Sequence, residues 1–257
     1  MLQISNILMN NMKKYILTLI LALASLGLYA QTNRNKTIIN AALHGWEYEI
    51  KAGVNLGGTA PLPFPEEIRS IDGYNPTLSI TIEGNMTKWL DTKKKWGIIT
   101  GLRLENKGMR TKATVKNYNM EIIGYDGNRL KGNWTGGVRT KVQNSYITIP
   151  VLAAYKLSPR TTLKLGPYFS YLMDGDFSGH VYEGYLRETN PTGDKINFTN
   201  GAIATYDFSG DLRKFQWGVQ AGVDWKAFKH LKVHADLNWG LNDIFNKDFK
   251  TVTFDMY

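Results

Sequence analysis

Residues Trp46 to Leu56 read WEYEIKAGVNL, and the alternation in this stretch decides the fold. Apolar or small side chains occupy the even positions, and mostly polar ones occupy the odd positions. Successive side chains of a β-strand point to opposite faces, so this pattern gives the strand one apolar face and one polar face. Its length also suits a tilted strand that crosses a bilayer. The stretch therefore predicts an amphipathic transmembrane β-strand.

The same alternation recurs along the rest of the chain and predicts about eight strands in all. Pro150 and Pro167 weaken two of them, because proline cannot donate to a sheet ladder. The further predicted strands are Thr77 to Thr87, Trp96 to Glu105, Tyr146 to Leu157, Thr161 to Leu172, Phe215 to Lys226, Leu231 to Leu241 and Thr251 to Met256.

The connections between these strands alternate in length. Outer-membrane barrels have short periplasmic turns and long extracellular loops. The short links are Asp91 to Lys95, Ser158 to Arg160 and Ala227 to His230, and the long ones are Gly57 to Pro76, Asn106 to Ser145 and Met173 to Lys214, with a shorter fourth at Asn242 to Phe249.

Alternation and loop lengths together predict an all-β fold. We expect a transmembrane antiparallel up-and-down β-barrel over residues 46–257, with both termini on the periplasmic side. A water-soluble sandwich or lipocalin-like barrel is the alternative, because alternation also arises when one face of a sheet meets water. The leader and the loop lengths favour the membrane.

The leader lies at Met12 to Ala30, MKKYILTLILALASLGLYA. Two lysines, an apolar run and a small residue before Gln31 are typical of a signal peptide. The apolar run is shorter than the roughly 20 residues of a transmembrane helix. We expect residues 1–11 to be an upstream start artefact, residues 31–45 to be a periplasmic tail, and the mature chain to reside in the outer membrane.

Composition limits the classes of function. The chain has no cysteine, which excludes disulfides, thiolate metal sites and a lipoprotein anchor. Its net charge of +9 includes Lys13 and Lys14 of the leader, so the excess is modest. We expect outer-membrane lipid as its surroundings, an envelope protein or lipopolysaccharide as its partner, and a monomer. Nucleic acid is not expected, and no cofactor is expected.

The polar faces of the predicted strands mix acids and bases. The interior of an eight-stranded barrel is just wide enough for side chains, so these groups are expected to pair and plug the lumen. A small selective pore is the alternative. The expected lumen residues are Glu47, Glu49, Lys51, Glu83, Arg103, Glu105, Lys156, Lys164, Asp224, Lys226, Lys232, His234, Asp236 and Asp255.

A surface hydrolase is a further alternative. His234 and Asp236 share one strand face about 7 Å apart at Cα, but no serine on a neighbouring strand is obviously placed beside them. His44, His180 and His230 lack the spaced partners of a metal site. The sequence therefore predicts no catalytic, cofactor-binding or metal-binding residues.

The loops offer the candidate binding surface. The predicted loop Asn106 to Ser145 is cationic and either grips lipopolysaccharide phosphates, glycans or an acidic protein, or continues the neighbouring strands as a solvated hairpin. The proline-rich loop Ala60 to Arg69 is expected to be a cap or a docking finger. The basic residues of the cationic loop are Lys107, Arg110, Lys112, Lys116, Arg129, Lys131, Arg139 and Lys141.

Two segments carry a family resemblance. Tyr146 to Met173, YITIPVLAAYKLSPRTTLKLGPYFSYLM, resembles the paired strands of the PorT-like outer-membrane β-barrel family, and Gly101 to Arg110, GLRLENKGMR, is similar to family members. The resemblance implies residence in the outer membrane. One branch of that family is linked to protein secretion, which makes an accessory role in secretion an alternative function. Outer-membrane barrels usually end with an aromatic residue in phase with the lipid-facing side chains of the last strand. Tyr257 departs from this pattern, because it falls in the phase of the polar side chains.

Overall fold

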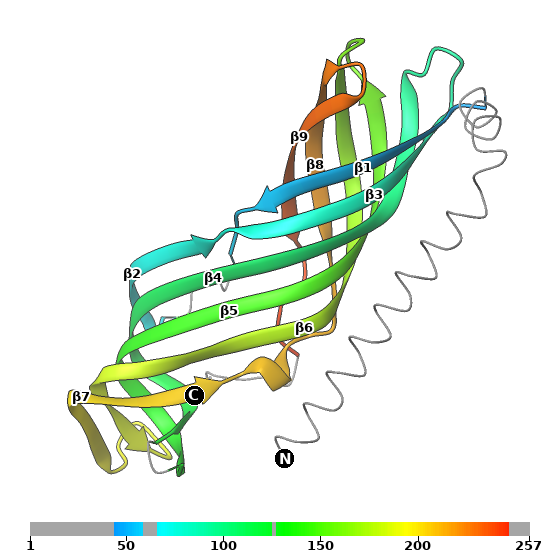
Figure 1. Ribbon diagram of the computed structural model, residues 1–257. Coiled ribbons are helices and arrows are strands. Elements are labelled where there is room, and N and C mark those ends of the chain that lie inside the picture. The colour runs from blue at the N-terminus through cyan, green and yellow to red at the C-terminus, as the bar shows by residue number, and fades with distance from the viewer. Residues whose placement is uncertain (1–43, 59–65, 125–126, 247–257) are drawn as a thin grey trace, which may run out of the picture. The chain divides into compact units, whose positions relative to one another are not determined.

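Nine β-strands form one antiparallel sheet in the computed structural model, which describes residues 44–58, 66–124 and 127–246 (Figure 1). A single turn of 3-10 helix, Ser209–Asp211, follows the seventh strand. Among the described residues, no helix combines the length and the apolar character that a membrane span requires. The strands are β1 Trp46–Asn55, β2 Ile68–Thr77, β3 Ser79–Trp89, β4 Trp96–Ile123, β5 Arg129–Lys156, β6 Thr161–Glu188, β7 Lys195–Asp207, β8 Phe215–Phe228 and β9 Leu231–Gly240.

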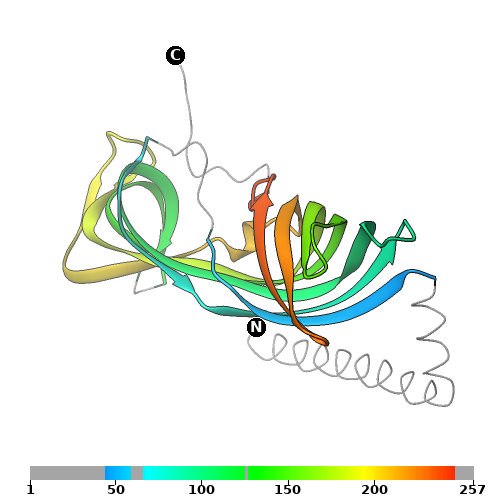
Figure 2. The same ribbon diagram turned by 90° about the horizontal axis from the view of Figure 1, so that it is seen from above.

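The sheet follows the order β1-β3-β4-β5-β6-β8-β9, with β2 and β7 branching from this path. β2 pairs with the second half of β4, and β7 pairs mainly with the second half of β6. Figure 2 shows the sheet curling around an interior. Side chains join its two end strands, because Lys232 of β9 lies 3.1 Å from Glu49 of β1, and His234 of β9 packs against Gly53 of β1. The all-β antiparallel barrel is confirmed.

The strand count of eight is wrong, because two strands lie inside segments that we expected to be loops. β2 occupies the predicted loop Gly57 to Pro76, and β7 occupies the predicted loop Met173 to Lys214. Seven predicted strands correspond to β1, β3, β4, β5, β6, β8 and β9. The eighth, Thr251 to Met256, lies outside the described residues, as do Tyr257, the leader, residues 31–43 of the tail and residues 60–65 of the proline-rich loop.

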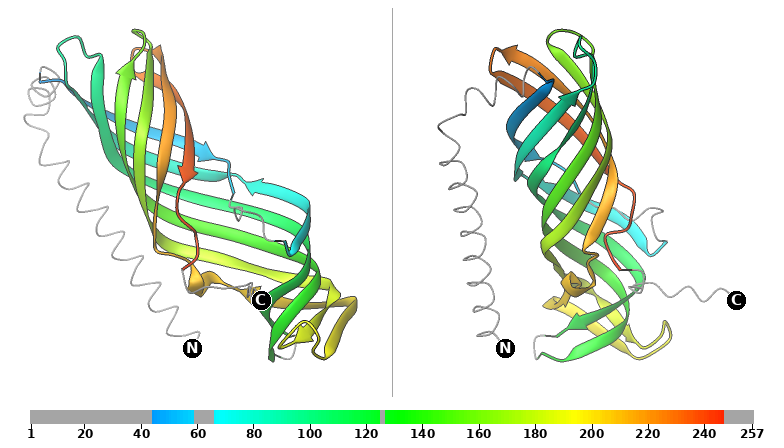
Figure 3. Two further views of the ribbon diagram at one scale, coloured as in Figure 1. Left: turned by 180° about the vertical axis from the view of Figure 1, so that it is seen from behind. Right: turned by 90° about the vertical axis from the view of Figure 1, so that its right-hand side faces the viewer.

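The cationic segment Asn106 to Ser145 is also not a loop. β4, β5 and β6 are each 28 residues long, so β4 and β5 run far beyond the predicted strands and leave only residues 124–128 between them. The solvated-hairpin interpretation of this segment is therefore correct for its backbone. Both views in Figure 3 show these three long strands continuing past the ends of β8 and β9.

The three short links are confirmed as tight turns. Between β3 and β4, the carboxylate of Asp91 accepts hydrogen bonds from the backbone N–H groups of Lys95 and Trp96, both at 2.8 Å. Between β5 and β6, Ser158 Oγ accepts the N–H groups of Arg160 and Thr161. These side chains replace the ladder bonds that the chain loses where it reverses.

The prolines in β5 and β6 sit at interruptions of the ladder. The pairing of β4 with β5 passes from Thr100–Val151 to Arg103–Thr148 and omits Pro150. The pairing of β5 with β6 omits Pro167 and the neighbouring Gly166. A Cβ on Gly166 would overlap the carbonyl oxygen of Val151, so this close backbone approach requires glycine. The strands thus accommodate both prolines without ending.

The first part of the barrel, which we call the membrane section, is apolar outside and largely polar inside, apart from a buried apolar cluster, Trp89, Ile99, Leu152 and Ala154. It comprises β1, β3, β8, β9 and residues 96–105, 146–156 and 161–173 of the long strands. On β4, Leu102 and Leu104 are exposed, whereas Arg103 and Glu105, which alternate with them, are buried. In water this arrangement would expose large apolar area and bury charge. It is the arrangement expected of a barrel surrounded by lipid.

The polarity inverts along the same strands beyond the membrane section. On β4 the inward positions become apolar at Met109 and Val115, and the outward positions become charged at Arg110 and Lys112. The inverted part, which we call the extension, comprises residues 106–123, 129–145 and 174–188 together with β2 and β7. Its core contains Val115, Met120, Ile122, Trp134, Val138, Val181, Leu186, Phe198, Ala204, Tyr206 and Phe208.

The inversion explains why the long strands were missed in the sequence. The strands were predicted from apolar residues at every second position. On β4 these residues change from even to odd positions between Glu105 and Met109. The segment in between, with Asn106, Lys107 and Gly108, carries polar or small residues on both faces. A period-2 pattern therefore fades there although the ladder continues without a break from Arg103 to Val115.

Candidate functional site

A network of charged side chains crosses the interior of the membrane section. Lys164 of β6 lies 2.6 Å from Asp224 of β8 and 2.8 Å from Asp236 of β9. Lys51 of β1 approaches the same oxygen of Asp224 at 3.4 Å. Two cations and two carboxylates from four strands thus balance each other within one cluster. All but Asp236, which is slightly more accessible, are almost fully buried.

A second cluster is centred on Arg103 of β4. Its guanidinium pairs with Glu83 of β3, lies 3.8 Å from Glu105, and donates at 2.6 Å to the amide oxygen of Gln220 on β8. Glu105 also accepts a hydrogen bond from Thr148 at 2.8 Å. Opposite charges and neutral hydrogen-bonding groups therefore pair with one another across the lumen, which offsets part of the cost of burying the charges.

Lys107 closes this second cluster towards the extension. Its ammonium lies 3.2 Å from Glu105 and stands over the rings of Tyr146 and Tyr168, 5.1 and 5.5 Å from their centroids. Cations bind favourably to aromatic faces, particularly where water is excluded. Lys107 therefore points into the lumen and belongs with the interior network, although it was predicted as part of a binding loop.

The prediction of the lumen residues is confirmed for those that are buried or half-buried and wrong for Lys226, which is exposed beside the β8–β9 turn. Lys232 is also exposed, although it pairs with Glu49. Glu47 is half-buried, and Lys156 lies half-buried over the ring of Trp89 at 4.4 Å. Asp255 lies outside the described residues. Lys51, Glu83, Arg103, Glu105, Lys164 and Asp224 are buried as expected, and Glu49, His234 and Asp236 are half-buried.

Neutral members of the network were not singled out from the sequence. Gln220 and Thr148 are fully buried, and Thr148 lies 2.7 Å from the hydroxyl of Ser170. Asn85 donates to Glu83. These residues occupy the same inward phase as the charged ones, so the phase was the available signal. The prediction considered only charged residues and therefore did not include these neutral ones.

The geometry separates the two residues of the hydrolase alternative. Asp236 is paired with Lys164, and His234 lies against the backbone of Gly53 on the neighbouring end strand. A catalytic aspartate orients an imidazole by bonding to it directly. Here the carboxylate has a different partner.

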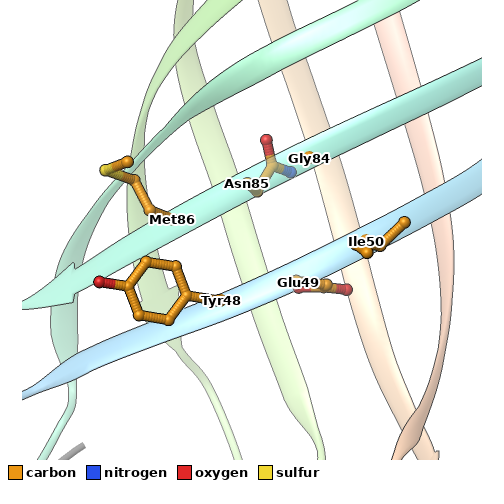
Figure 4. A pocket seen from close by; sticks show the side chains of 6 residues that line it. All are labelled: Tyr48, Glu49, Ile50, Gly84, Asn85 and Met86. Atoms are coloured by element: carbon orange, nitrogen blue, oxygen red, sulfur yellow. The ribbon is translucent and has the colours of Figure 1, made fainter. Parts of the chain in front are cut away.

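A hollow of about 570 Å³ opens between β1 and β3 (Figure 4). Tyr48 and Ile50 of β1 and Met86 of β3 are exposed on its apolar side. Glu49 is the one charged residue among the six that line it, and Glu49 already pairs with Lys232. The hollow thus presents an apolar surface to the lipid-facing side of the barrel and has no free charged group.

The eight basic residues of the candidate surface divide into four places. Lys107 faces the lumen, as described above. Arg129 pairs with Glu121 at 2.8 Å, and Lys131 stands opposite Glu121 in the ladder, both near the far end of the β4–β5 pair. Lys116 is exposed, and its backbone N–H donates to the carbonyl of Glu67.

The remaining four basic residues form a contiguous patch on the outer face of the extension. Arg110 pairs in the ladder with Lys141, and Lys112 pairs with Arg139. All four are exposed. Residues directly opposite in an antiparallel ladder have Cβ atoms about 5 Å apart, and residues two apart on one strand are about 7 Å apart. We call these four residues the cationic quartet.

The surroundings of the quartet are ordered. The guanidinium of Arg139 stands over the ring of Tyr182, 5.0 Å from its centroid. The hydroxyl of Tyr206 donates to the carbonyl of Arg139 at 3.0 Å and lies 2.6 Å from Thr140 Oγ1. Burial raises the pKa of Tyr206, so its phenol stays protonated and keeps this bond. Arg139 is therefore held by its backbone and by its side chain.

Two titratable groups adjoin the quartet. Partial burial of Asp176 opposes ionisation, but hydrogen bonds from Ser178 and from Lys141, at 3.1 Å, outweigh it and lower the pKa of Asp176. Partial burial and the positive charge of Arg139 lower the pKa of His180. At neutral pH Asp176 is therefore a carboxylate and His180 is a neutral imidazole.

Comparison with known proteins identifies the family. The outer membrane protein beta-barrel domain matches residues 29–246, which is most of the chain. Searches of curated proteins and of solved structures gave no match. The family and the exposed apolar face of the membrane section both place the protein in the outer membrane. The chain therefore belongs to the outer membrane protein beta-barrel domain family.

Proposed function

We propose that this protein is a non-enzymatic outer-membrane barrel with a plugged lumen, which acts by binding a partner or a glycolipid through its extension. The observation that carries the proposal is the buried network around Arg103 and Lys164, which spans the interior from β1 to β9. Buried ions leave such a network only at a large cost in free energy. The apolar core of the extension supports the proposal, because it fills the space beyond the lumen.

The binding part of the proposal rests on where the polarity inverts. Outside the lipid the extension presents a charged outer face on long, paired strands. Because the tight turns of Asp91 and Ser158 lie at the opposite end, they are the periplasmic turns and the extension is extracellular. A rigid extracellular sheet of this kind positions side chains for recognition better than a mobile loop does.

Single-channel recording tests the plug. Full-length protein refolded into planar bilayers is expected to show no steady conductance. The matched positive control replaces Arg103, Glu83 and Gln220 together by serine, which empties one cross-section of the lumen and is expected to produce small openings. Steady openings by the wild-type protein would contradict the proposal and favour the small-pore alternative.

The absence of enzymatic activity is part of the same proposal. It is supported by the engagement of Asp236 with Lys164, away from His234. The lipid and protease profiles of cells carrying His234→Ala are expected to match those of the wild type. A lost activity in that variant would restore the surface hydrolase.

The leader and the family resemblance lead to two further proposals. We infer that the signal peptide at residues 12–30 is removed, which the mass of the mature protein tests directly.

An accessory role in a PorT-like secretion system is the second candidate function. It is favoured by the family resemblance of Tyr146 to Met173, the segment that forms the β5–β6 hairpin of the membrane section. Normal levels of every secreted protein after deletion of the gene would count against it.

A further inference from the structure

The cationic quartet concentrates charge that the chain itself does not balance. Within the described residues, the one carboxylate paired with it is Asp176, 3.1 Å from Lys141, and no ion pair is formed by Arg110, Lys112 or Arg139. On the β2 side, Arg110 and Lys112 stand opposite Asn75 and Gly73, and the carboxylate of Asp72 next to Gly73 accepts hydrogen bonds from Ser70 and Thr114 without forming an ion pair with any described residue. Three of the four cations therefore lack an anionic partner in this part of the chain.

The register of the quartet is unfavourable without an external anion. Arg110 opposes Lys141, and Lys112 opposes Arg139, so two directly opposed pairs carry like charge. Like charges directly opposite in a ladder destabilise the sheet. An anion bound between the pairs would remove this repulsion. Two guanidinium groups are well suited to such an anion, because each can form two parallel hydrogen bonds to a phosphate or a carboxylate.

The height of the quartet above the membrane selects the kind of anion. The last exposed apolar residues of β4 and β5 are Leu104 and Ile149, with Ile147 between Ile149 and the extension. Arg110 and Lys141 lie six residues beyond Leu104 and Ile147. At about 3.3 Å per residue and a tilt of about 40°, this separation corresponds to about 15 Å of height.

A phospholipid does not reach that height. Its headgroup layer extends only about 5 to 8 Å beyond the hydrocarbon on each side of a bilayer. A glycolipid that carries phosphates or carboxylates on sugars above its acyl chains does reach it. Such a molecule would also place its acyl chains against the apolar outer face of the same strands.

From these observations we propose that the cationic quartet, Arg110, Lys112, Arg139 and Lys141, binds the anionic sugars of an outer-leaflet glycolipid whose acyl chains pack on the membrane section below. The inference rests on the proposed function in one respect, since it assigns a ligand to the extension. Tyr182 fixes one guanidinium of the site, and Asp176 restrains Lys141 until the anion competes for it.

The test compares two variants of equal charge. In the quartet variant Arg110, Lys112, Arg139 and Lys141 are all replaced by glutamine. In the control variant Lys116, Arg129, Lys131 and Lys195 are replaced by glutamine, which removes the same charge elsewhere on the extension. The probe is purified lipopolysaccharide with phosphorylated lipid A and inner-core sugars, titrated against the full-length barrel in detergent.

We expect the quartet variant to bind lipopolysaccharide at least about tenfold more weakly than the wild type, because each cation near an anionic surface contributes appreciably to binding. The control variant is expected to stay within about twofold. Equal losses in both variants, or no loss in the quartet variant, would overturn the inference. Wild-type binding of equal strength to phosphatidylglycerol vesicles or to inorganic phosphate would overturn it as well.

Two measurements keep the outcome interpretable. The heat-dependent shift in gel mobility reports folding of each barrel, and if the quartet variant does not fold, the double variant Lys112→Gln/Arg139→Gln keeps the Lys141–Asp176 pair and is expected to lose about half of the effect on a logarithmic scale. Conductance of the same wild-type preparation tests the plug separately. Open channels with intact quartet-dependent binding would refute the plugged lumen and leave the glycolipid site standing.

Discussion

Arg103 of β4 donates a hydrogen bond to Gln220 of β8 at 2.6 Å, although β5 and β6 separate their strands in the sheet. A flat sheet would hold these strands far apart, since neighbouring strands are about 4.8 Å apart. The bond exists because the sheet curls and both side chains point into the same narrow interior. The chemistry of the lumen is thus a consequence of barrel closure.

Lys164→Met is expected to destabilise the barrel by about 3 to 5 kcal/mol, because it leaves Asp224 and Asp236 close together with less balancing charge. Urea-induced unfolding in lipid vesicles measures the effect. Lys226→Met is the control, since this lysine is exposed beside a turn and its loss is expected to change stability by less than about 0.5 kcal/mol. Similar midpoints for the two variants would show that Lys164 is not needed to balance the two carboxylates.

The inversion of polarity predicts that an arginine on the outward face of β5 is tolerated in the extension and not in the membrane section. Val151 and Gln143 both point outward from β5, and both are exposed. Val151→Arg puts a charge near the middle of the membrane section and is expected to cost about 2 to 4 kcal/mol. Gln143→Arg lies in the extension and is expected to be nearly neutral. The yield of folded barrel in vesicles distinguishes them, and equal tolerance would contradict the assigned boundary.

Trp134→Ala is expected to loosen the extension without unfolding the membrane section. Trp134 is fully buried and packs edge-on against Phe198, 5.3 Å between ring centroids. Removing a buried tryptophan costs about 3 to 5 kcal/mol. Limited proteolysis of intact vesicles should then cleave the extension while the heat-dependent mobility shift persists. Simultaneous loss of both would mean that the two parts fold as one unit.

The protonation of His180 is predicted to respond to the quartet. Burial and the charge of Arg139, its partner on β5, place the pKa of His180 below the ordinary value of 6.5, while its partner on β7 is the uncharged Thr205, with Asp207 two residues further along. As the pH falls from 6.5 towards this lower value, the unfolded chain binds its proton first. The free energy of unfolding of the extension therefore falls as the pH drops through that window. Above pH 6.5, His180 is neutral in both states and this loss is absent.

Titration of the His180 imidazole by NMR checks this. Arg139→Gln is expected to raise the pKa of His180 towards its ordinary value, and a bound anionic glycolipid should raise it further. By reciprocity the glycolipid should bind more tightly below pH 6.5. An unchanged pKa in Arg139→Gln would show that Arg139 does not act on His180.

The sequence by itself determined the barrel, its apolar outer face and the mixed charge of its interior. Each of these is a one-dimensional pattern, because alternation along a single strand reveals which side chains share a face. For this reason Lys51, Arg103 and Glu105 were correctly assigned to the lumen. The family match over residues 29–246 agrees with that assignment of the fold.

Only the tertiary structure decided which groups meet. Asp236 pairs with Lys164, 72 positions before it in the chain, and not with its near neighbour His234, because sheet register and curl set the distances between strands. The same holds for the quartet, where the β4–β5 register brings Lys112 opposite Arg139. It also holds for β2 and β7, whose pairing follows from long partner strands. Register depends on the turns and on the buried faces of both partner strands together, so the alternation along one strand does not reveal which residue of a distant strand it will meet.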